Sequence, residues 1–359
     1  MACLTYISFF LLFVYILEIL TQDINEVIHE YDRYEIMKIL EGGKFLKGIN
    51  DPKSETGEYP VEVAEVKPFY MDVYPVTNAQ YWKFRQARPN YRTDAERNGK
   101  SWVLKHFVDP KNRPKTSTDD AANWIEVTGA DWLRPEGPSS SIRDRLDYPV
   151  VHISYKDAKE FCEHYHKRLP SEEEWEYAAR GGYYGLSYPW GDRYQKNRSN
   201  LWQGKFPDGN TKADSWEGLS PVHAFKPQND FGLYDVLGNV WEWTTTRYYE
   251  RVVPRSVQDK MFVVRGCSFI DTRDGQANSL VRVSQRMGLG PSYSAYNVGF
   301  RCAKSAKHYW KKPVQPPMRD LPKERSSGPR QHLRSEMVDP DLAEKLKKEL
   351  KKKKEKDEL

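Results

Sequence analysis

Hydrophobic residues recur with helical spacing in two stretches near the middle of the chain. After Ser154 they fall at i, i+3, i+4 and i+7, at Ala158, Phe161, Cys162 and Tyr165. After Ser171 they form a similar apolar side at Trp175, Ala178 and Ala179. Spacing of this kind places the residues on one face of a helix, and Gly181 is the type of residue that ends one. The pattern therefore predicts two amphipathic helices that pack on a core.

Three capping boxes mark helix starts, at residues 77–80, 154–157 and 171–174. In each, a Ser or Thr hydroxyl and an acidic or amide side chain three residues later can satisfy each other's free backbone amides. The first box predicts a further helix with Tyr81 and Phe84 on its apolar side. Short apolar runs predict strands at residues 35–40 and 149–153. The stretch 264–302 begins as a buried strand, crosses a polar run and ends in a second strand.

Other parts of the chain lack any sustained period. Residues 89–137 are rich in Asp, Asn, Pro and Trp, and we interpret them as ordered but irregular structure. Six of the 11 Trp residues lie between Trp175 and Trp243 among Gly, Asn, Asp and Pro. Such a segment is held by large aromatic side chains packed between loops and by bound ligands such as metal. We expect one domain of low regular secondary structure over residues 22–304.

Both ends of the chain carry targeting patterns. The apolar run 7–17 is too short to span a bilayer and is followed by Glu18, so residues 1–21 are interpreted as a secretory signal peptide. The last four residues read Lys-Asp-Glu-Leu, the retrieval signal of the endoplasmic reticulum (ER) lumen. Residues 305–359 are expected to form a charged linker and a helix that displays this signal, with partner binding by that helix as the alternative.

Charge is unevenly distributed along the chain. The formal net charge of +5 arises from the residues after position 302, which carry +7, whereas the preceding residues carry −2. The expected domain is therefore not basic, and nothing favours a nucleic-acid-binding face. We likewise expect no membrane attachment once the signal peptide is removed.

The cysteine count limits the redox chemistry. Of four cysteines, one lies in the expected signal peptide, which leaves Cys162, Cys267 and Cys302. An odd number in an oxidising compartment favours one disulfide and one remaining thiol. No Cys-x-x-Cys pair exists, which excludes a zinc ribbon and a thioredoxin-like motif.

Six motifs together resemble the formylglycine-generating enzyme family, also called the sulfatase-modifying factor family. They read YPVTNAQYWKF (74–84), PVVHISYKDAKEFC (149–162), KRLPSEEEWEYAARGG (167–182), GLYDVLGNVWEWT (232–244), RGCSF (265–269) and NVGFRC (297–302). They span most of the expected domain in the family's order. The resemblance implies a single compact α+β domain related to C-type lectin-like folds. It also implies a disulfide between Cys162 and Cys302, which would close a long loop.

Active members of this family oxidise a cysteine of a new sulfatase to formylglycine, using oxygen and two cysteines that hold copper. Thiolates are required because soft sulfur ligands stabilise monovalent copper. Counted from the RGCSF motif, these two positions are Asp271 and Gln276. The resemblance is therefore to the branch without the catalytic pair, and we expect neither copper nor catalysis. Cys267 lies four residues before the first of these positions, Asp271, and is expected to be a buried thiol on a strand.

A second pair of family cysteines is also missing. Active members commonly have another disulfide between the second predicted helix and the stretch 264–302. The helix position is Ala179, and its partner is expected near Val281. The absence of both partners agrees with an inactive branch.

The resemblance implies two structural calcium sites. The first would be made by the Asn200 side chain, the Leu201 carbonyl, Asp214 and the Trp216 carbonyl. The second would be made by Asp235, the Gly238 and Val240 carbonyls and Glu242. Mixed carboxylate, amide and backbone oxygens suit calcium because it accepts irregular coordination. In the absence of the resemblance, Asp214 and Asp235 would more often be loop caps.

Three functions remain open at this stage. The first is a catalytically silent binding protein of the ER lumen that recognises the unfolded C-x-P-x-R segment of sulfatases, with Trp241 and Ser268 in a retained groove, or that pairs with the active enzyme. The second is an oxidase with an altered site at Cys267, and the third is calcium-dependent glycan binding, by analogy with lectin-like folds. Asn197 begins an N-x-S sequon and is expected to be glycosylated. A homodimer is compatible with the sequence.

Overall fold

The computed structural model describes residues 30–54, 56–114, 123–207, 209–249, 260–275 and 279–306. The expected signal peptide, residues 307–359 of the expected linker and helix with their retrieval signal, and Gln276 lie outside these ranges, whereas Ser305 ends a strand. No helix within the ranges is long and apolar enough to cross a bilayer.

The described residues form short helices and strands joined by long loops. The 3-10 helices are η1 (Glu30–Tyr34), η2 (Lys105–Phe107) and η3 (Pro110–Asn112), and the α-helices are α2 (Asn78–Ala87), α3 (Asp94–Asn98), α4 (Tyr155–His164) and α5 (Glu172–Arg180). The strands are β1 (Met37–Leu40), β2 (Gly43–Lys47), β3 (Glu62–Val66), β4 (Phe69–Asp72), β5 (Lys100–Leu104), β6 (Trp124–Thr128), β7 (Gly204–Lys205), β8 (Gly209–Asn210), β9 (Trp241–Arg247), β10 (Phe262–Arg265), β11 (Arg286–Leu289), β12 (Val298–Gly299) and β13 (Ala303–Ser305).

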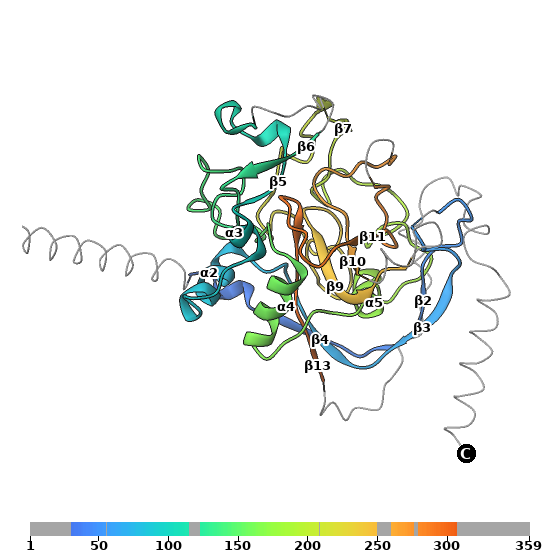
Figure 1. The fold of residues 1–359 in the computed structure, drawn as a ribbon. Helices are drawn as coiled ribbons and strands as arrows, with labels where there is room; N and C mark the ends of the chain where they lie inside the picture. The colour runs from blue at the N-terminus through green and yellow to red at the C-terminus, as the bar shows by residue number, and fades with distance from the viewer. Residues whose placement is uncertain are drawn as a thin grey trace, which may run out of the picture.

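A four-stranded sheet with the order β11-β10-β9-β12 lies at the centre of the molecule (Figure 1). Strand β10 is antiparallel to β9 and β11, and β12 runs parallel to β9. A second sheet has the order β1-β4-β13, in which all pairs are antiparallel. The pairs β2–β3, β5–β6 and β7–β8 form two-stranded sheets around these. The mixed architecture with little regular structure confirms the α+β expectation.

The predicted helix starts are confirmed. Helices α2, α4 and α5 each begin with the expected capping box, in which the hydroxyl and the side chain three residues later bond reciprocally. Helix α5 ends at Gly181, which adopts the left-handed conformation with φ of 61°. The assignment of Tyr165 to the buried face of α4 is wrong, because this residue caps the helix and is exposed.

Two expectations about regular structure are also wrong. Residues 149–153 are extended but make only an isolated bridge from Pro149 to Thr77, and His152 at φ of 60° breaks any continuous ladder. Residues 89–137 contain helix α3 and the β5–β6 pair. A capping box between Thr93 and Glu96 opens α3, and buried residues alternate along β6. Both local signals were present in the sequence.

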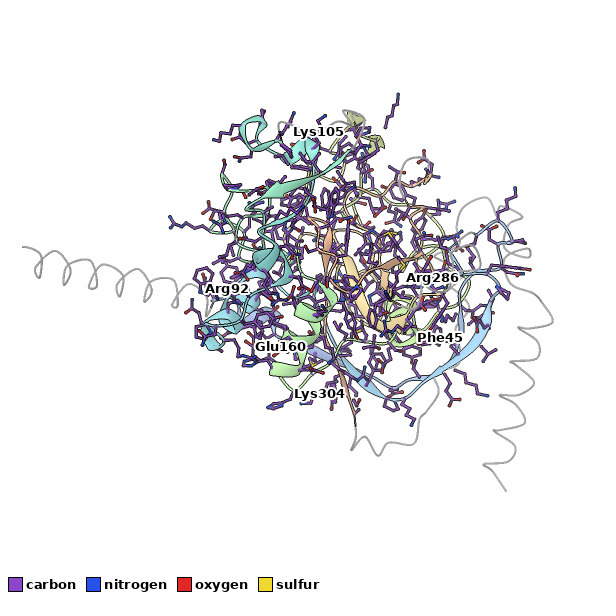
Figure 2. The ribbon with its side chains drawn as sticks, viewed as in Figure 1. Phe45, Arg92, Lys105, Glu160, Arg286 and Lys304 are labelled. Carbon is purple, nitrogen blue, oxygen red and sulfur yellow. A yellow bond between two sulfur atoms is a disulfide. The ribbon has the colours of Figure 1, made fainter. Side chains whose placement is uncertain are left out.

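Side chains fill the space between the elements (Figure 2), and the buried hydrophobic ones form three clusters. The first contains the disulfide between Cys162 and Cys302, which joins α4 to the residue before β13. This bond is the one that the family resemblance implied. Ala179 belongs to the second cluster together with Val283, whereas Val281 belongs to the first. The pairing expected between Ala179 and a residue near Val281 stays a prediction.

Buried ion pairs connect helix α5 to the central sheet. Arg265 at the end of β10 donates to Glu172 at 2.9 Å and to Glu176 at 2.7 Å, and all three side chains are buried. Arg286 of β11 donates to Glu172 as well, at 2.7 Å. These pairs fix the end of β10, from which the candidate site begins.

Candidate functional site

The chain turns sharply where the sequence predicted a continuing strand. Strand β10 ends at Arg265, and Gly266 and Cys267 follow with φ of 100° and 60°. A side chain at Gly266 would place its Cβ 3.1 Å from the indole of Trp175, so the tight approach requires glycine. The three residues between Cys267 and Asp271 therefore form a turn, and the strand geometry assumed for them is wrong.

Asp271 lies at the centre of this turn with its carboxylate buried. One oxygen accepts hydrogen bonds from the Ser268 N–H at 2.7 Å and the Ser268 hydroxyl at 2.8 Å. The other accepts from the Ser279 N–H at 3.0 Å, and the Trp241 side chain is a further donor. Asp271 thus links the turn at Ser268 to Ser279 and to Trp241 of the central sheet.

The structure brings Trp241 and Ser268, the two predicted groove residues, together at Asp271. It adds Asn297, whose Nδ2 donates to the Ser268 hydroxyl at 3.1 Å. Sequence reasoning did not assign a role to Asn297, although it is the first residue of the NVGFRC motif. The four side chains form a polar cluster that is 6% exposed at most.

Burial controls the ionisation of this cluster. It raises the pKa of Asp271 from 3.8 to about 6, because an ionised carboxylate loses solvation there and the surrounding donors only partly compensate. Burial also raises the pKa of Cys267, and the nearby Asp271 raises it further. Cys267 is therefore a protonated, buried thiol, as expected, and a poor nucleophile or metal ligand at neutral pH.

Stability is expected to fall as the pH rises through the pKa of Asp271. Because this pKa is higher in the folded chain than in the unfolded one, the folded state binds the Asp271 proton more tightly. The stability that this proton contributes is present below about pH 4 and is lost as the pH rises to about 6. The contribution is on the order of 3 kcal/mol. Urea unfolding from pH 4 to 8 in chelator measures it, and Asp271→Asn should flatten this part of the curve. An unchanged curve in the variant would contradict the assignment.

The residues of the first predicted calcium ligand set lie in one loop cluster, and calcium binding by them stays a prediction. The Asp214 carboxylate accepts from the Leu201 N–H at 3.1 Å and from the Trp216 N–H at 3.0 Å. The Asn200 amide lies in the same loop cluster and donates to the Gly218 carbonyl at 2.8 Å. Burial raises the pKa of Asp214, and the groups that counter this rise are backbone and amide donors rather than cations. A buried carboxylate compensated in this way fits a hard cation.

The second predicted set fits a cation less well. Both Glu242 oxygens accept from Arg301 at 2.7 Å, and one also accepts from the Trp175 indole at 2.7 Å. The Gly238 carbonyl accepts from the Val240 N–H at 2.9 Å. Asp235 remains buried, and burial raises its pKa to about 7. The second site stays a prediction, but Glu242 is not a free ligand.

Some metal sites are built from acidic, histidine and cysteine side chains alone. No group of three such side chains that could hold a metal ion occurs among the described residues. A cation at Asp214 would therefore rely on the amide and carbonyl oxygens of the predicted set.

Asn197 is exposed, with Ser199 two residues later buried. The asparagine side chain is thus accessible on the surface, as a glycosylation acceptor has to be. Glycosylation itself stays a prediction.

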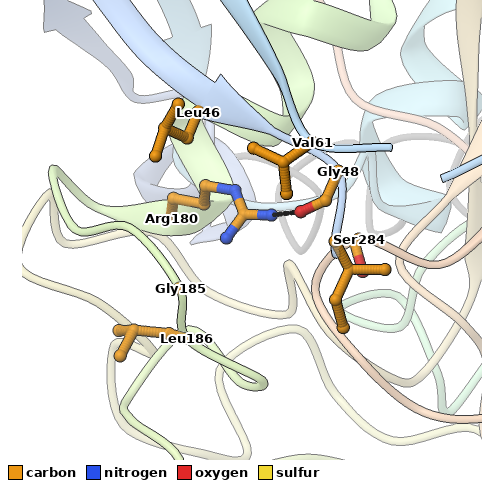
Figure 3. Close-up of a pocket in the computed structure, with 8 residues that line it drawn as sticks. Leu46, Gly48, Val61, Arg180, Gly185, Leu186 and Ser284 are labelled. Carbon is orange, nitrogen blue, oxygen red and sulfur yellow. Dashed lines mark hydrogen bonds between the residues drawn. The ribbon is translucent and has the colours of Figure 1, made fainter. Parts of the chain in front are cut away.

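A small pocket lies apart from the Asp271 cluster (Figure 3). Arg180 donates across it to the Gly48 carbonyl at 2.8 Å, and Leu46, Leu186 and Ser284 contribute to its wall. Its volume of about 10 Å³ has room for a single water molecule. It does not accommodate a peptide.

Comparison with known proteins identifies the family. The model of the sulfatase-modifying factor enzyme 1-like domain matches residues 25–306. The chain belongs to this sulfatase-modifying factor family.

Two mouse members of the family differ in what their names state. The inactive C-alpha-formylglycine-generating enzyme 2 is 49% identical over 268 residues, which cover 74% of this chain and 85% of the mouse protein. The mouse formylglycine-generating enzyme is 39% identical over 279 residues, which cover 74% of this chain and 73% of that protein. The bovine inactive enzyme 2 is 48% identical over 269 residues, covering 74% and 87%. Similarity is thus higher to the inactive members.

Solved structures agree on the fold of this sulfatase-modifying factor domain. PvdO from Pseudomonas aeruginosa superimposes with a TM-score of 0.53 at 21% identity, covering 75% of this chain and 94% of that one. The single-domain fold implied by the sequence motifs is therefore confirmed.

Proposed function

We propose that this chain is a non-catalytic paralogue of the formylglycine-generating enzyme, resident in the ER lumen. In this role it binds sulfatases through their C-x-P-x-R segment, or pairs with the active enzyme, and so modulates sulfatase activation. The names of the mouse and bovine inactive relatives support the absence of catalysis. The C-terminal Lys-Asp-Glu-Leu sequence supports the location.

The main support for the proposal is the buried, hydrogen-bonded carboxylate of Asp271. Family resemblance assigns a copper-binding thiol to this position, and the chain has instead a buried carboxylate whose two oxygens accept from Ser268 and Ser279. Hard carboxylate oxygens do not stabilise monovalent copper. Gln276, at the other thiol position, lies outside the described residues and carries an amide. The residues therefore favour recognition without oxidation.

An altered oxidase built on Cys267 receives no support from the geometry. The thiol is 0% exposed and its pKa is raised by burial. Attack or metal binding requires the thiolate and access to it. Calcium-dependent glycan binding rests on the fold analogy alone.

A binding experiment tests the proposed role. The full-length chain is expressed in the secretory pathway and captured from ER extracts after mild crosslinking, and its partners are identified by mass spectrometry. In parallel, a synthetic C-x-P-x-R peptide and a scrambled peptide of the same composition are titrated onto the purified chain. We expect sulfatases or the active enzyme among the partners, with preference for the native peptide when sulfatases are found. Absence of both partners together with equal binding of the two peptides would contradict the proposal.

A further inference from the structure

Asn239 lies between the two predicted calcium ligand sets and bonds to a member of each. Its Oδ1 accepts from the Asn200 Nδ2 at 3.2 Å, and its Nδ2 donates to the Asp235 carboxylate at 2.9 Å. Asn200 belongs to the first set and Asp235 to the second. Asn239 itself was not assigned to either set.

All hydrogen-bonding positions of the Asn239 amide are in use. Besides Asn200 and Asp235, the Oδ1 accepts from the Ser220 N–H at 3.1 Å and the Nδ2 donates to the Ser220 carbonyl at 3.0 Å. An amide has two donor hydrogens and one oxygen with two lone pairs. Turning this amide over would set donor against donor and acceptor against acceptor, so its orientation is fixed.

The fixed amide of Asn239 determines which atom Asn200 offers to a cation. The Asn200 Nδ2 donates to Asn239 and to the Gly218 carbonyl at 2.8 Å, which uses both of its hydrogens. The Asn200 Oδ1 is the remaining polar atom of that side chain, and an amide oxygen is a ligand that calcium accepts. We propose that Asn239 is a positioning residue that holds Asn200 with its oxygen toward a calcium ion shared with Asp214.

The backbone of Asn239 ties this cation site to the Asp271 turn. Its N–H donates to the Asn200 carbonyl at 2.9 Å, and its own carbonyl accepts from the Phe269 N–H at 3.0 Å. Phe269 lies between Ser268 and Asp271. A cation that orders Asn200 therefore also orders the turn at the Asp271 cluster, and its loss loosens both.

The test removes the Asn239 amide without straining the backbone. Asn239 has φ of 65°, in the left-handed region that glycine adopts freely, so Asn239→Gly deletes only the side chain. Asn229→Ala is the matched control. The Asn229 amide also makes four hydrogen bonds, to the carbonyls of Ala178 and Ala179 and from the N–H groups of Phe231 and Leu233, and none of these residues belongs to a predicted cation site.

Calcium is titrated onto the purified full chain and both variants by calorimetry, and the rise in melting temperature on adding calcium is recorded. The natural chain should bind calcium and be stabilised by it. Asn239→Gly should bind at least about tenfold more weakly, as is typical when a residue that orients a metal ligand is removed. Asn229→Ala should keep affinity within about twofold of the natural chain.

Equal affinity in Asn239→Gly and the natural chain, or an equal loss in both variants, would overturn the proposal. So would the absence of calcium binding to the natural chain at millimolar concentration. If Asn239→Gly fails to fold, Asn200→Ala replaces it, since this variant removes the oxygen that Asn239 is proposed to orient. The proposal then requires that Asn200→Ala bind calcium at least about tenfold more weakly than the natural chain. These results do not depend on whether the chain binds sulfatases.

Discussion

Replacing Arg301 with methionine is expected to lower the free energy of unfolding by about 3–5 kcal/mol, the usual cost of removing one partner of a buried ion pair. Arg301 is 0% exposed. Its guanidinium donates to both oxygens of Glu242, and to the carbonyls of Asp72, Val73, Tyr234 and Asp235. The variant leaves the Glu242 charge buried, with the Trp175 indole as its remaining donor.

Urea unfolding followed by tryptophan fluorescence measures this effect. The control is Lys159→Met, which removes a surface ion pair to Glu163 between half-exposed side chains, and its cost should stay below about 1 kcal/mol. Adding Glu242→Gln to Arg301→Met should recover part of the loss, because the double variant no longer buries an unpaired charge. A loss in Arg301→Met no larger than that of Lys159→Met would show that Arg301 is not part of the core.

Removing the disulfide is expected to lower the free energy of unfolding by about as much as Arg301→Met does. The bond between Cys162 and Cys302 spans a sequence separation of 140 residues. In the chain-entropy model a loop of that length restricts the unfolded chain by about 5 kcal/mol. The double variant Cys162→Ala/Cys302→Ala should therefore unfold at much lower urea concentration than the natural chain.

The matched control for the disulfide is Cys267→Ala. It removes a buried thiol without opening a loop, so its cost should be at most half that of the double variant. Equal losses in the two variants would show that side-chain packing, rather than the closed loop, is what the disulfide contributes.

Local signals in the sequence were sufficient to predict the helices. A capping box and a terminal glycine act within a few residues, so the starts of α2, α4 and α5 and the end of α5 at Gly181 could be found from the chain alone. The same kind of signal is present at Thr93, where α3 begins. The strands were harder to predict, because most are four or five residues long and pair with partners far along the chain.

The site could be predicted only in part, for two physical reasons. The turn after β10 depends on a positive φ at Cys267, and a cysteine in the sequence gives no reason to predict a positive φ. Asn239 and Asn297 act through partners that are 39 and 29 residues away. Such contacts follow from the tertiary fold, so motif spacing located Asp271 and Ser268 but not Asn239 and Asn297.

The engagement of Glu242 is the clearest difference between the expected and the observed chemistry. The family resemblance predicted that Glu242 is a calcium ligand. In the structure its carboxylate accepts hydrogen bonds from Arg301 and from the Trp175 indole. The groups that donate to Asp214 are backbone and amide N–H groups rather than a cation, so the first ligand set, at Asn200 and Asp214, is the better candidate for a cation. Calcium binding at one site rather than two is the result that this arrangement favours.

Because Asp271 and Gln276 replace a copper-binding thiol pair, the natural chain is expected not to generate formylglycine, and one assay tests this most directly. The natural chain and the double variant Asp271→Cys/Gln276→Cys are incubated in parallel with a C-x-P-x-R peptide, monovalent copper and oxygen, and the peptide is examined by mass spectrometry for an aldehyde at its cysteine. The active formylglycine-generating enzyme serves as the positive control. We predict that the natural chain forms no formylglycine at any enzyme concentration that saturates the control. Formylglycine produced by the natural chain would contradict the proposal that it is not catalytic.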